Sequence, residues 1–510
     1  MKTLRFQLAV MVIAIIAFSC NQTKQQGKEA KPLTKYKMTT DIPASITTPD
    51  SVQTSLGTLK FFDGFPDAAT VKKVYDNLDF QRGVQAYLTA LPVASMFATR
   101  EGYRTFGPDN QTILIAETFL DSRTLYLVAN SETIYLTVWA DTKEGPMVME
   151  APPDMLGVLD DFWCRFVIDV GRAGPDKGKG GKYLLLPPGY TGDVPEGYFI
   201  ARSPTYGNLV MLRGFIKDGD MKATVENMKK HFRIYPLALA AHPPEMNFVN
   251  MSGRYFNCIG ATDVSFFDQV NKVIQEEPLE AVDPEVRGLL AAIGIRKGEA
   301  FAPDPRMKGI LADAVAVGHA TARAIAFSTR DSAAYLYPGS WWKMAFLGND
   351  YKFSPGGVLD PDARIYYFCL ATGVSPAMMV KMVGLGSQYA LTERDANGQY
   401  LDGAKSYSLH LPPDIPVKDF WSVLVYDPQT RSMLQTDQQY PSCSNQKKGL
   451  IVNPDSSVDI YFGPEPPSGK ENNWVQTIPG KGWWLGLRLY GPGEAWFDKT
   501  WRPGEIKMIE

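Results

Sequence analysis

The sequence contains 510 residues, of which 45% are hydrophobic, 21% charged and 12% aromatic. This is a globular composition, and it excludes a disordered, collagen-like or coiled-coil chain. The 52 Lys and Arg residues nearly balance the 55 Asp and Glu residues, for a net charge of −3, so no global positive field is available to hold nucleic acid. At about 100 to 200 residues per domain, the length predicts two to four domains, each with its own core.

The N-terminus has the features of an export signal. Lys2 and Arg5 precede an apolar run over residues 8–18, which is too short for a permanent membrane span of about 30 Å but fits the core of a signal peptide. A small residue followed by Cys20 then gives the arrangement of a bacterial lipoprotein cleavage site. We therefore predict a signal peptide over residues 1–19 and lipidation of Cys20. The alternative is an ordinary secretory signal in which Cys20 is incidental.

A polar tether is expected over residues 20–50, because the stretch after the cysteine is rich in Gln, Lys and Thr and has little to bury. The predicted protein is thus exported and held at a membrane by its acyl chains, on the periplasmic or cell-surface face. The membrane is the one partner that the N-terminus indicates.

Hydrophobic periodicity predicts an N-terminal β domain with flanking helices over residues 51–262. Helical spacing of apolar residues extends over 66–106, and an acidic start favours another helix over 221–232. Between these helices, β-branched and aromatic runs bounded by Pro and Gly predict strands. The expected strands are 125–138, 146–150, 182–186, 198–201 and 209–216.

The rest of the chain is predicted to be helical over 263–335 and β-rich over 336–510. Three apolar stripes separated by prolines indicate separate helices in the first of these segments. The strands expected in the second are 407–411, 420–426, 458–462 and 483–490. The predicted fold class is therefore mainly β with inserted helices (α+β), with two jelly-roll or β-sandwich domains linked by a helical segment.

The motifs of several common enzyme classes are missing from the sequence. There is no HExxH, no GxSxG and no EF-hand loop. The glycine-rich stretch 174–182 looks like a phosphate loop but lacks its spacing, so a hairpin loop is the better interpretation. Only four histidines occur, none at metal-ligand spacing, and the cysteines form no CxxC pair. We therefore expect no cofactor and no metal site.

Tryptophans concentrate in the C-terminal region, where eight of the 10 lie at or after Trp341. Aromatic faces beside polar groups bind sugar rings and other flat ligands, although filling of a β core is the preferred explanation for most of these residues. Strand alternation over 483–490 places Trp484, Arg488 and Tyr490 on one face. That face is too polar for a dry core unless Arg488 is paired, so it is a candidate ligand surface.

A polar cluster marks the N-terminal β domain at residues 130–141. Alternation puts Thr133 and Tyr135 on one side of a strand, with Asn130 and Glu132 near its start. A carboxylate, an amide and a phenol at one strand end form a candidate acid/base or binding site. A turn followed by a half-exposed strand is the alternative explanation for the same residues.

Two parts of the sequence resemble known families. Residues 130–141, with Gly-Tyr-Thr-Gly at 189–192 and Pro-Glu-Gly-Tyr at 195–198, are similar to the bacterial domain-of-unknown-function family 1254. The tail resembles family 1214 in its motifs at 395–403, 420–422, 426–427, 472–474 and 487–490. The resemblance implies two domains of jelly-roll type and no assigned reaction. The matching positions that it implies as site residues are Asn130, Glu132, Thr133, Tyr135, Asn473, Trp474 and Arg488.

Two functional hypotheses follow. In the first, the jelly rolls of a lipid-anchored protein bind a carbohydrate or an aromatic small molecule, or assemble with copies of the same chain. The ligand-binding residues in this hypothesis are Asn130, Thr133, Asn473, Trp474 and Trp484. In the second, the protein is a hydrolase or lyase that acts on an exported substrate through Glu132, Tyr135 and Arg488. Nucleic acid is not expected as a partner in either.

Overall fold

The computed structural model describes residues 36–216 and 219–509. The predicted signal peptide and the predicted lipidation residue Cys20 therefore lie outside the described residues. The chain divides into two compact units, one up to Lys73 and one from Val74 onward.

The first unit contains a small antiparallel sheet. Its strands are β1 (Ser51–Thr54), β2 (Gly57–Phe62) and β3 (Phe65–Pro66). Large apolar side chains on this sheet are exposed, including Phe62 at 80% and Phe65 at 73%. Among the described residues of this unit only Thr70 is buried, so the unit has little core of its own.

Helix α1 (Ala68–Arg104) begins in the first unit and continues into the second. It confirms the helix predicted over residues 66–106. Residues 86–100 are buried except for Leu91, so this part of the helix belongs to the core of the second unit.

The N-terminal β region of the second unit consists of two sheets that share a core. The six-stranded sheet has the order β14-β4-β6-β12-β8-β9, and the four-stranded sheet has the order β11-β10-β7-β13. The strand bounds are β4 (Thr112–Ile115), β6 (Ile134–Asp141), β7 (Met147–Ala151), β8 (Met155–Asp161), β9 (Phe166–Gly171), β10 (Gly181–Leu186), β11 (Phe199–Arg202), β12 (Gly207–Gly214), β13 (Arg233–Pro236) and β14 (Asn247–Asn250). Leu136, Leu185 and Val210 belong to one hydrophobic cluster between the sheets, to which α2 (Met221–His231) adds Met228.

The strand predicted over residues 125–138 is interrupted. The structure has β5 (Thr124–Leu125), then a turn over residues 126–133, and then β6. The side-chain oxygen of Asn130 accepts hydrogen bonds from the backbone N–H groups of Glu132 and Thr133, both at 3.1 Å. Such local bonding competes with the hydrogen bonds of a strand, which is why the turn forms here.

Helices occupy the segment where apolar stripes predict them. They are α3 (Ser265–Glu276), α4 (Pro284–Ala292) and α5 (Pro305–Phe327), followed by α6 (Pro361–Leu370). Asp304 caps α5 by accepting a hydrogen bond from the backbone N–H of Met307 at 2.7 Å. Among the helices of the described residues, α5 alone is long and apolar enough to cross a membrane. Its buried face, which includes Leu311 and Val315, packs in the core, so its length and composition are weak evidence for a span.

The C-terminal β region also pairs two sheets around a core. The five-stranded sheet has the order β16-β17-β23-β19-β20, and the four-stranded sheet has the order β22-β21-β18-β24. The strand bounds are β16 (Lys343–Met344), β17 (Ser387–Thr392), β18 (Ser406–Leu411), β19 (Val417–Tyr426), β20 (Ser442–Ser444), β21 (Val458–Gly463), β22 (Trp474–Gln476), β23 (Trp484–Pro492) and β24 (Lys507–Ile509). Leu409, Val423 and Leu487 lie between the sheets. The predicted fold class, mainly β with inserted helices, is confirmed.

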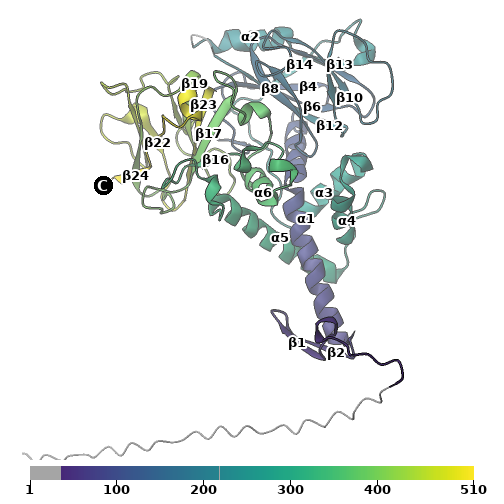
Figure 1. Cartoon of the computed structure of the whole chain (residues 1–510). Coiled ribbons are helices and arrows are strands. Elements are labelled where there is room, and N and C mark those ends of the chain that lie inside the picture. The colour runs from purple at the N-terminus through teal and green to yellow at the C-terminus, as the bar shows by residue number, and fades with distance from the viewer. Residues whose placement is uncertain (1–35, 217–218, 510) are drawn as a thin grey trace, which may run out of the picture. The chain divides into compact units, whose positions relative to one another are not determined.

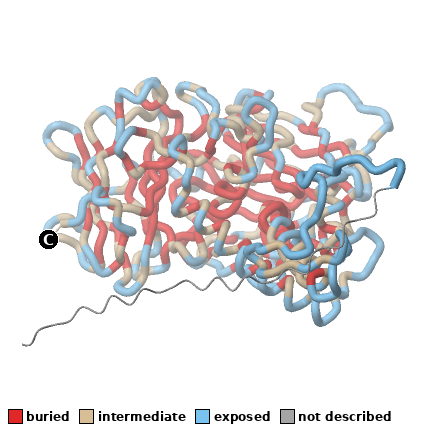
Figure 2. The backbone as a smooth tube through the Cα atoms, turned by 60° about the horizontal axis from the view of Figure 1, so that its bottom comes forward, coloured by how far each residue is buried: buried red, intermediate tan, exposed pale blue. Residues whose placement is uncertain are grey.

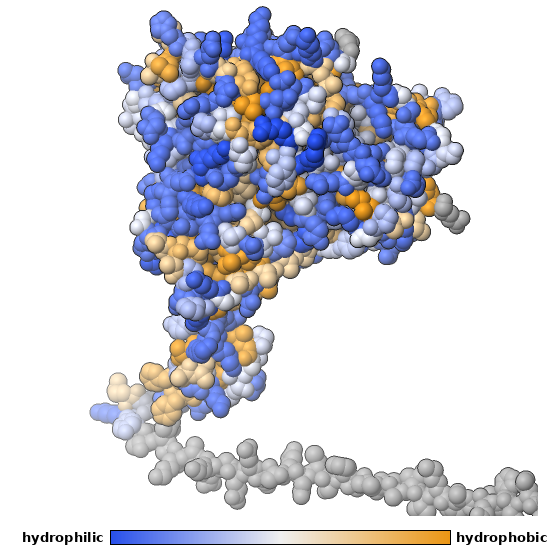
Figure 3. All heavy atoms as spheres, turned by 180° about the vertical axis from the view of Figure 1, so that it is seen from behind, coloured by the Kyte–Doolittle hydropathy of each residue, from blue (hydrophilic) through white to orange (hydrophobic). Residues whose placement is uncertain are grey.

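The two β regions meet along β23, which lies beside β19 and β17 in the C-terminal region (Figure 1). One face of this strand, with Leu485 and Leu487, belongs to the C-terminal core. The other face, with Trp484 and Tyr490, joins clusters that contain residues of the N-terminal region. Buried residues run without a break through both regions in Figure 2, whereas the face in Figure 3 is mostly hydrophilic with scattered apolar residues. The junction between the regions is thus part of the core.

Candidate binding site at the junction of the two β regions

Strand alternation brings polar side chains from three strands to the junction. On β6, Tyr135 belongs to the hydrophobic cluster that also contains Trp484 of β23. Its neighbours Ile134 and Leu136 enter the N-terminal core instead. On β12, Arg213 pairs in register with Tyr135, and on β23, Arg488 pairs with Tyr389 of β17. The predicted residues Tyr135 and Arg488 therefore reach the same junction from different regions of the chain.

Arg488 is buried, with 3% exposure, and its hydrogen-bond partners are neutral. Its Nη2 donates to the carbonyl oxygen of Val128 and, at 2.8 Å, to the hydroxyl of Tyr426. The guanidinium carbon lies 5.4 Å from the ring centre of Tyr389. The Nε atom has no hydrogen-bond partner, and no carboxylate in residues 36–216 or 219–509 forms an ion pair with Arg488.

Arg213 is the second cation at the junction. Its guanidinium carbon lies 5.5 Å from the ring centre of Tyr135, and its Nε is buried without a hydrogen-bond partner. No hydrogen bond or ion pair joins the Arg213 side chain to any residue that the structure describes. Two guanidinium groups thus share the junction, and neither is paired with an acid.

Tyrosines surround the arginines but do not neutralise them. The hydroxyl of Tyr490 accepts a hydrogen bond from Nδ2 of Asn130 at 2.7 Å, and the hydroxyl of Tyr426 donates to the carbonyl oxygen of Ala129 at 3.0 Å. Burial raises the pKa of both phenols well above the usual value. Both therefore remain protonated at neutral pH, and the two positive charges stay without compensation from these groups.

A small cavity of about 50 Å³ is lined by both arginines and by Val128, Thr372 and Tyr389. The space accommodates a few water molecules or one group of carboxylate size. Val128, whose carbonyl accepts from Arg488, has a φ of 52°. This left-handed conformation is a genuine outlier for a β-branched residue, and strain of this kind clusters at functional sites.

The predicted acid, Glu132, borders a different and wider pocket of about 750 Å³, together with Ser131 and Ser442. Burial raises the pKa of the Glu132 carboxyl, and hydrogen bonds and the Arg488 charge oppose that shift. One of its oxygens accepts from the Ser131 hydroxyl at 2.9 Å. Glu132 and Arg488 are thus neighbours that line separate cavities, and Tyr135 lines neither of the two.

The predicted ligand residues Asn130 and Thr133 are fully buried. Besides the two backbone bonds of the turn, the Asn130 side-chain oxygen accepts from the Thr133 hydroxyl at 3.0 Å. With its amide donating to Tyr490, Asn130 uses both ends of its side chain within the protein. These two residues position the turn over 126–133 beside the cavity.

The structure places the other predicted residues apart from the cavity. Trp484 is 1% exposed and packs on Tyr426, with ring centres 4.7 Å apart. The amide of Asn473 donates to backbone carbonyls of Ile451 and Asp459, both at 2.8 Å. Trp474, on the edge strand β22, donates to a backbone carbonyl at 2.9 Å. Asn473 and Trp474 thus support the C-terminal fold, whereas Trp484 packs in the cluster that joins the two β regions.

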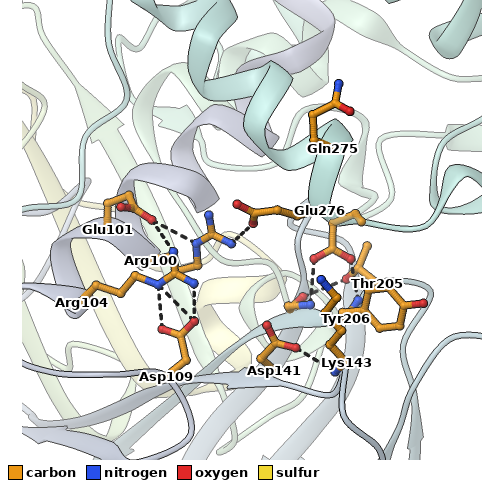
Figure 4. A network of polar contacts seen from close by, with 12 residues as sticks. Arg100, Glu101, Arg104, Asp109, Asp141, Lys143, Thr205, Tyr206, Gln275 and Glu276 are labelled. Atoms are coloured by element: carbon orange, nitrogen blue, oxygen red, sulfur yellow. Dashed lines mark hydrogen bonds and ion pairs between the residues drawn. The ribbon is translucent and has the colours of Figure 1, made fainter. Parts of the chain in front are cut away.

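A second polar network joins helices α1 and α3 to β12 (Figure 4). Arg100 of α1 is 2% exposed and forms an ion pair with Glu276 of α3. The next residue, Glu277, accepts hydrogen bonds from the backbone N–H groups of Tyr206 at 2.6 Å and Gly207 at 3.0 Å. Burial raises the pKa of Glu277 to about 7. This network fixes the helical segment against the sheet and lines neither junction cavity.

The comparisons with known proteins agree with this division of the chain. Residues 110–236 match a family model described as a protein of unknown function, DUF1254, and residues 386–494 match another, DUF1214. The part that matches DUF1254 is called the DUF1254 region and the part that matches DUF1214 the DUF1214 region. Arg213 lies in the first and Arg488 in the second, so the cavity is built by both. No curated protein matches the chain.

One solved structure supports the fold. The chain is similar to the VPA0106 protein from Vibrio parahaemolyticus, with 17% identity, a TM-score of 0.54 and coverage of 85% of this chain and 100% of that one. It also matches an uncharacterized protein from Burkholderia cenocepacia, with 10% identity, a TM-score of 0.38 and coverage of 86% and 95%. The likeness to the Vibrio protein shows a shared fold and no more.

Sequence reasoning missed Arg213 and the tyrosines of β17 and β19. A usable signal was present, because Arg213 is the one charged residue in the strand predicted over 209–216, whose other residues are apolar or glycine. A lone cation on the buried side of such a strand needs a partner. Nothing in the sequence shows that its neighbour is Arg488, far along the chain.

Proposed function

We propose that this chain is an exported, lipid-anchored protein that binds a small molecule through an anionic group at the junction of its DUF1254 and DUF1214 regions. The observation that carries the proposal is the pair Arg213 and Arg488, which line one cavity without an acidic partner. Exposure to solvent does not explain the unpaired charge of Arg488, which is buried, and the Nε of the half-buried Arg213 is likewise buried without a partner.

Electrostatics favour an anion in this cavity. A buried charge without a partner is costly, and an anion between the two guanidinium groups would offset that cost. Guanidinium groups present N–H donors in a planar fork that matches a carboxylate or a phosphate. The surrounding phenols are neutral donors and acceptors that orient such a group without competing for it.

Binding is tested by calorimetry on the purified full chain with acetate and inorganic phosphate as probes. The proposal expects heat of binding and a raised melting temperature with at least one probe, and loss of both in Arg213→Met. Arg254→Met is the matched control, because Arg254 packs on Phe106 and does not line this cavity. No binding by the unaltered protein, or equal binding by Arg213→Met, would contradict the proposal.

Export and anchoring rest on the N-terminal sequence. The mature N-terminus is expected to begin at a diacylated or triacylated Cys20, which intact-mass spectrometry of the membrane fraction detects. A Cys20→Ser variant should leave the membrane fraction. An unmodified N-terminus upstream or downstream of Cys20 would refute the anchor.

A second candidate function is that of a hydrolase or lyase, which would cleave an exported substrate by hydrolysis or by elimination. It is favoured by one observation, the buried Glu132 carboxyl with its raised pKa at the wall of a pocket of about 750 Å³, since a carboxyl with a raised pKa is suited to general acid/base catalysis. A panel of ester, amide and glycoside substrates tests it, with Glu132→Gln as the variant. Turnover by the unaltered protein that is lost in Glu132→Gln would support the enzyme hypothesis. No turnover of any substrate on the panel would rule it out.

A further inference from the structure

We propose that a second pocket, bordered by α1, the turn between β8 and β9, and α6, binds a flat aromatic carboxylate. It has a volume of about 450 Å³ and shares no lining residue with the two pockets at the junction. The proposal is therefore independent of the anion site at Arg213 and Arg488.

The walls of this pocket are aromatic. Phe166 and Tyr351 meet edge to face with ring centres 5.5 Å apart, and Phe353 meets Phe368 in the same way at 5.4 Å. Trp163 adds a fifth ring. Pockets of a few hundred Å³ with aromatic walls and few polar groups are typical small-molecule sites, and edge and face contacts of this kind suit a planar ring.

One cation lines the pocket without a partner. The side chain of Arg364 on α6 forms no hydrogen bond or ion pair with the described part of the chain, and its Nε is buried and unpaired. Burial lowers its pKa, and the charge of Asp283 opposes that shift, although the two residues form no ion pair. An Arg side chain in the wall of an aromatic pocket, without an ion pair to an acid, is a recognition element for a carboxylate.

The other charged residues of the pocket do not fill this role. Arg165 is neutralised by Asp161, with Nε and Oδ2 2.6 Å apart. Lys352 is exposed and lies 5.6 Å from the ring centre of Tyr351. Asp283 is the only acid in the lining and is exposed. The pocket thus carries an excess of positive charge that favours an anionic ligand over a neutral or cationic one.

Two lining residues have a strained backbone. Cys164 has a φ of 54° and Phe353 a φ of 55°, a conformation that is unusual for a side chain as large as Phe. Asp161 stabilises the first of these, since its Oδ1 accepts from the backbone N–H groups of Trp163 at 2.8 Å and Arg165 at 2.9 Å. Strain at two residues that line one pocket is typical of a functional site.

The test compares 2-naphthoate with its neutral amide, 2-naphthamide, on the full chain. Isothermal calorimetry and quenching of tryptophan fluorescence measure the affinity of each. We expect the acid to bind at least about ten-fold more tightly than the amide, and Arg364→Gln to reduce the affinity for the acid to that of the amide. Arg296→Gln is the matched control, since Arg296 is exposed and does not line the pocket.

Each outcome decides the proposal. Equal affinity for acid and amide, no binding of the acid at millimolar concentration, or an unchanged affinity in Arg364→Gln overturns it. If Arg364→Gln fails to fold, Tyr351→Ala is the second variant, because Tyr351 is half-buried in a loop and its ring forms one wall of the pocket. This variant is expected to reduce the affinity for the acid about ten-fold as well. Unchanged affinity in that variant overturns the proposal equally.

Discussion

The side-chain amide of Asn130 donates a hydrogen bond of 2.7 Å to the hydroxyl of Tyr490, 360 positions further along the chain. The same Asn130 side chain holds the turn at 126–133 through its oxygen. One residue therefore connects the local shape of the DUF1254 region to the DUF1214 strand that carries Arg488. The turn and the cavity lining depend on this contact, because Val128 of the turn accepts the hydrogen bond from Arg488.

Asn130→Ala is expected to lower the free energy of unfolding by about 3 kcal/mol, since it leaves several buried donors without acceptors. Tyr490→Phe removes only the hydroxyl and should cost about 1 kcal/mol. Urea denaturation followed by fluorescence measures both. A loss in Asn130→Ala no larger than in Tyr490→Phe would show that the turn does not need the Asn130 oxygen.

The two junction arginines should differ in their effect on stability. Arg488→Met deprives Val128 and Tyr426 of a donor and should cost about 1–3 kcal/mol. Arg213→Met removes a cation without a polar partner, so the ligand-free protein should be as stable as the unaltered one or more stable. Thermal melts in a buffer without carboxylate or phosphate make the comparison. Equal destabilisation by both variants would mean that Arg213 has a partner in solution.

Glu277 should make stability decrease as pH rises. Its pKa is raised from 4.5 to about 7 in the fold, so between these values the folded protein binds more protons than the unfolded chain. The contribution is fully present near pH 4 and is lost as pH rises through about 7, by at most about 3 kcal/mol. Urea midpoints near pH 5 and pH 8 should therefore differ less in Glu277→Gln than in the unaltered protein. An identical pH dependence in both proteins would exclude Glu277 as the cause.

Two glycines before β17 provide a matched pair. A Cβ on Gly386, with a φ of 70°, would lie 2.1 Å from the carbonyl oxygen of Ala377, whereas one on Gly384, with a φ of 74°, would meet nothing closer than 3.5 Å. Gly384→Ala should cost about 1 kcal/mol from backbone strain alone. Gly386→Ala adds a backbone clash and should lower stability by about 3 kcal/mol or more, or prevent soluble expression. Equal melting temperatures would show that the chain relaxes around Gly386.

Much of the fold could be predicted because it follows from periodicity. The alternation of β23 predicted correctly that Leu485 and Leu487 share one face and Trp484 and Arg488 the other. The helix at α1 and those at α3 to α5 follow from apolar stripes. The strand predicted over 125–138 was wrong at its start, because the hydrogen bonds of the Asn130 side chain outweigh the β propensity of the surrounding residues.

The candidate site could be predicted only in part. Arg488 stood out as a cation on a strand face, and Asn130 and Glu132 as a polar cluster, yet the sequence placed them in separate domains. Arg213 and Arg364 belong to no recognisable sequence motif. They stand out only because neither has an acidic ion-pair partner among the described residues. A missing acidic partner is a property of the packed structure and has no local signal.

By itself, the sequence determined the near-neutral composition, the alternation of each strand and the apolar stripes of the helices. The last two follow from residues that are only a few positions apart in the chain. Only the tertiary structure decided which faces meet. The second face of β23 is buried against β6 and β12 of the other region, and burial turns an ordinary arginine into an uncompensated charge. Tertiary packing elsewhere in the molecule brings Arg364 and five aromatic rings from separate segments to one pocket, which no local pattern specifies.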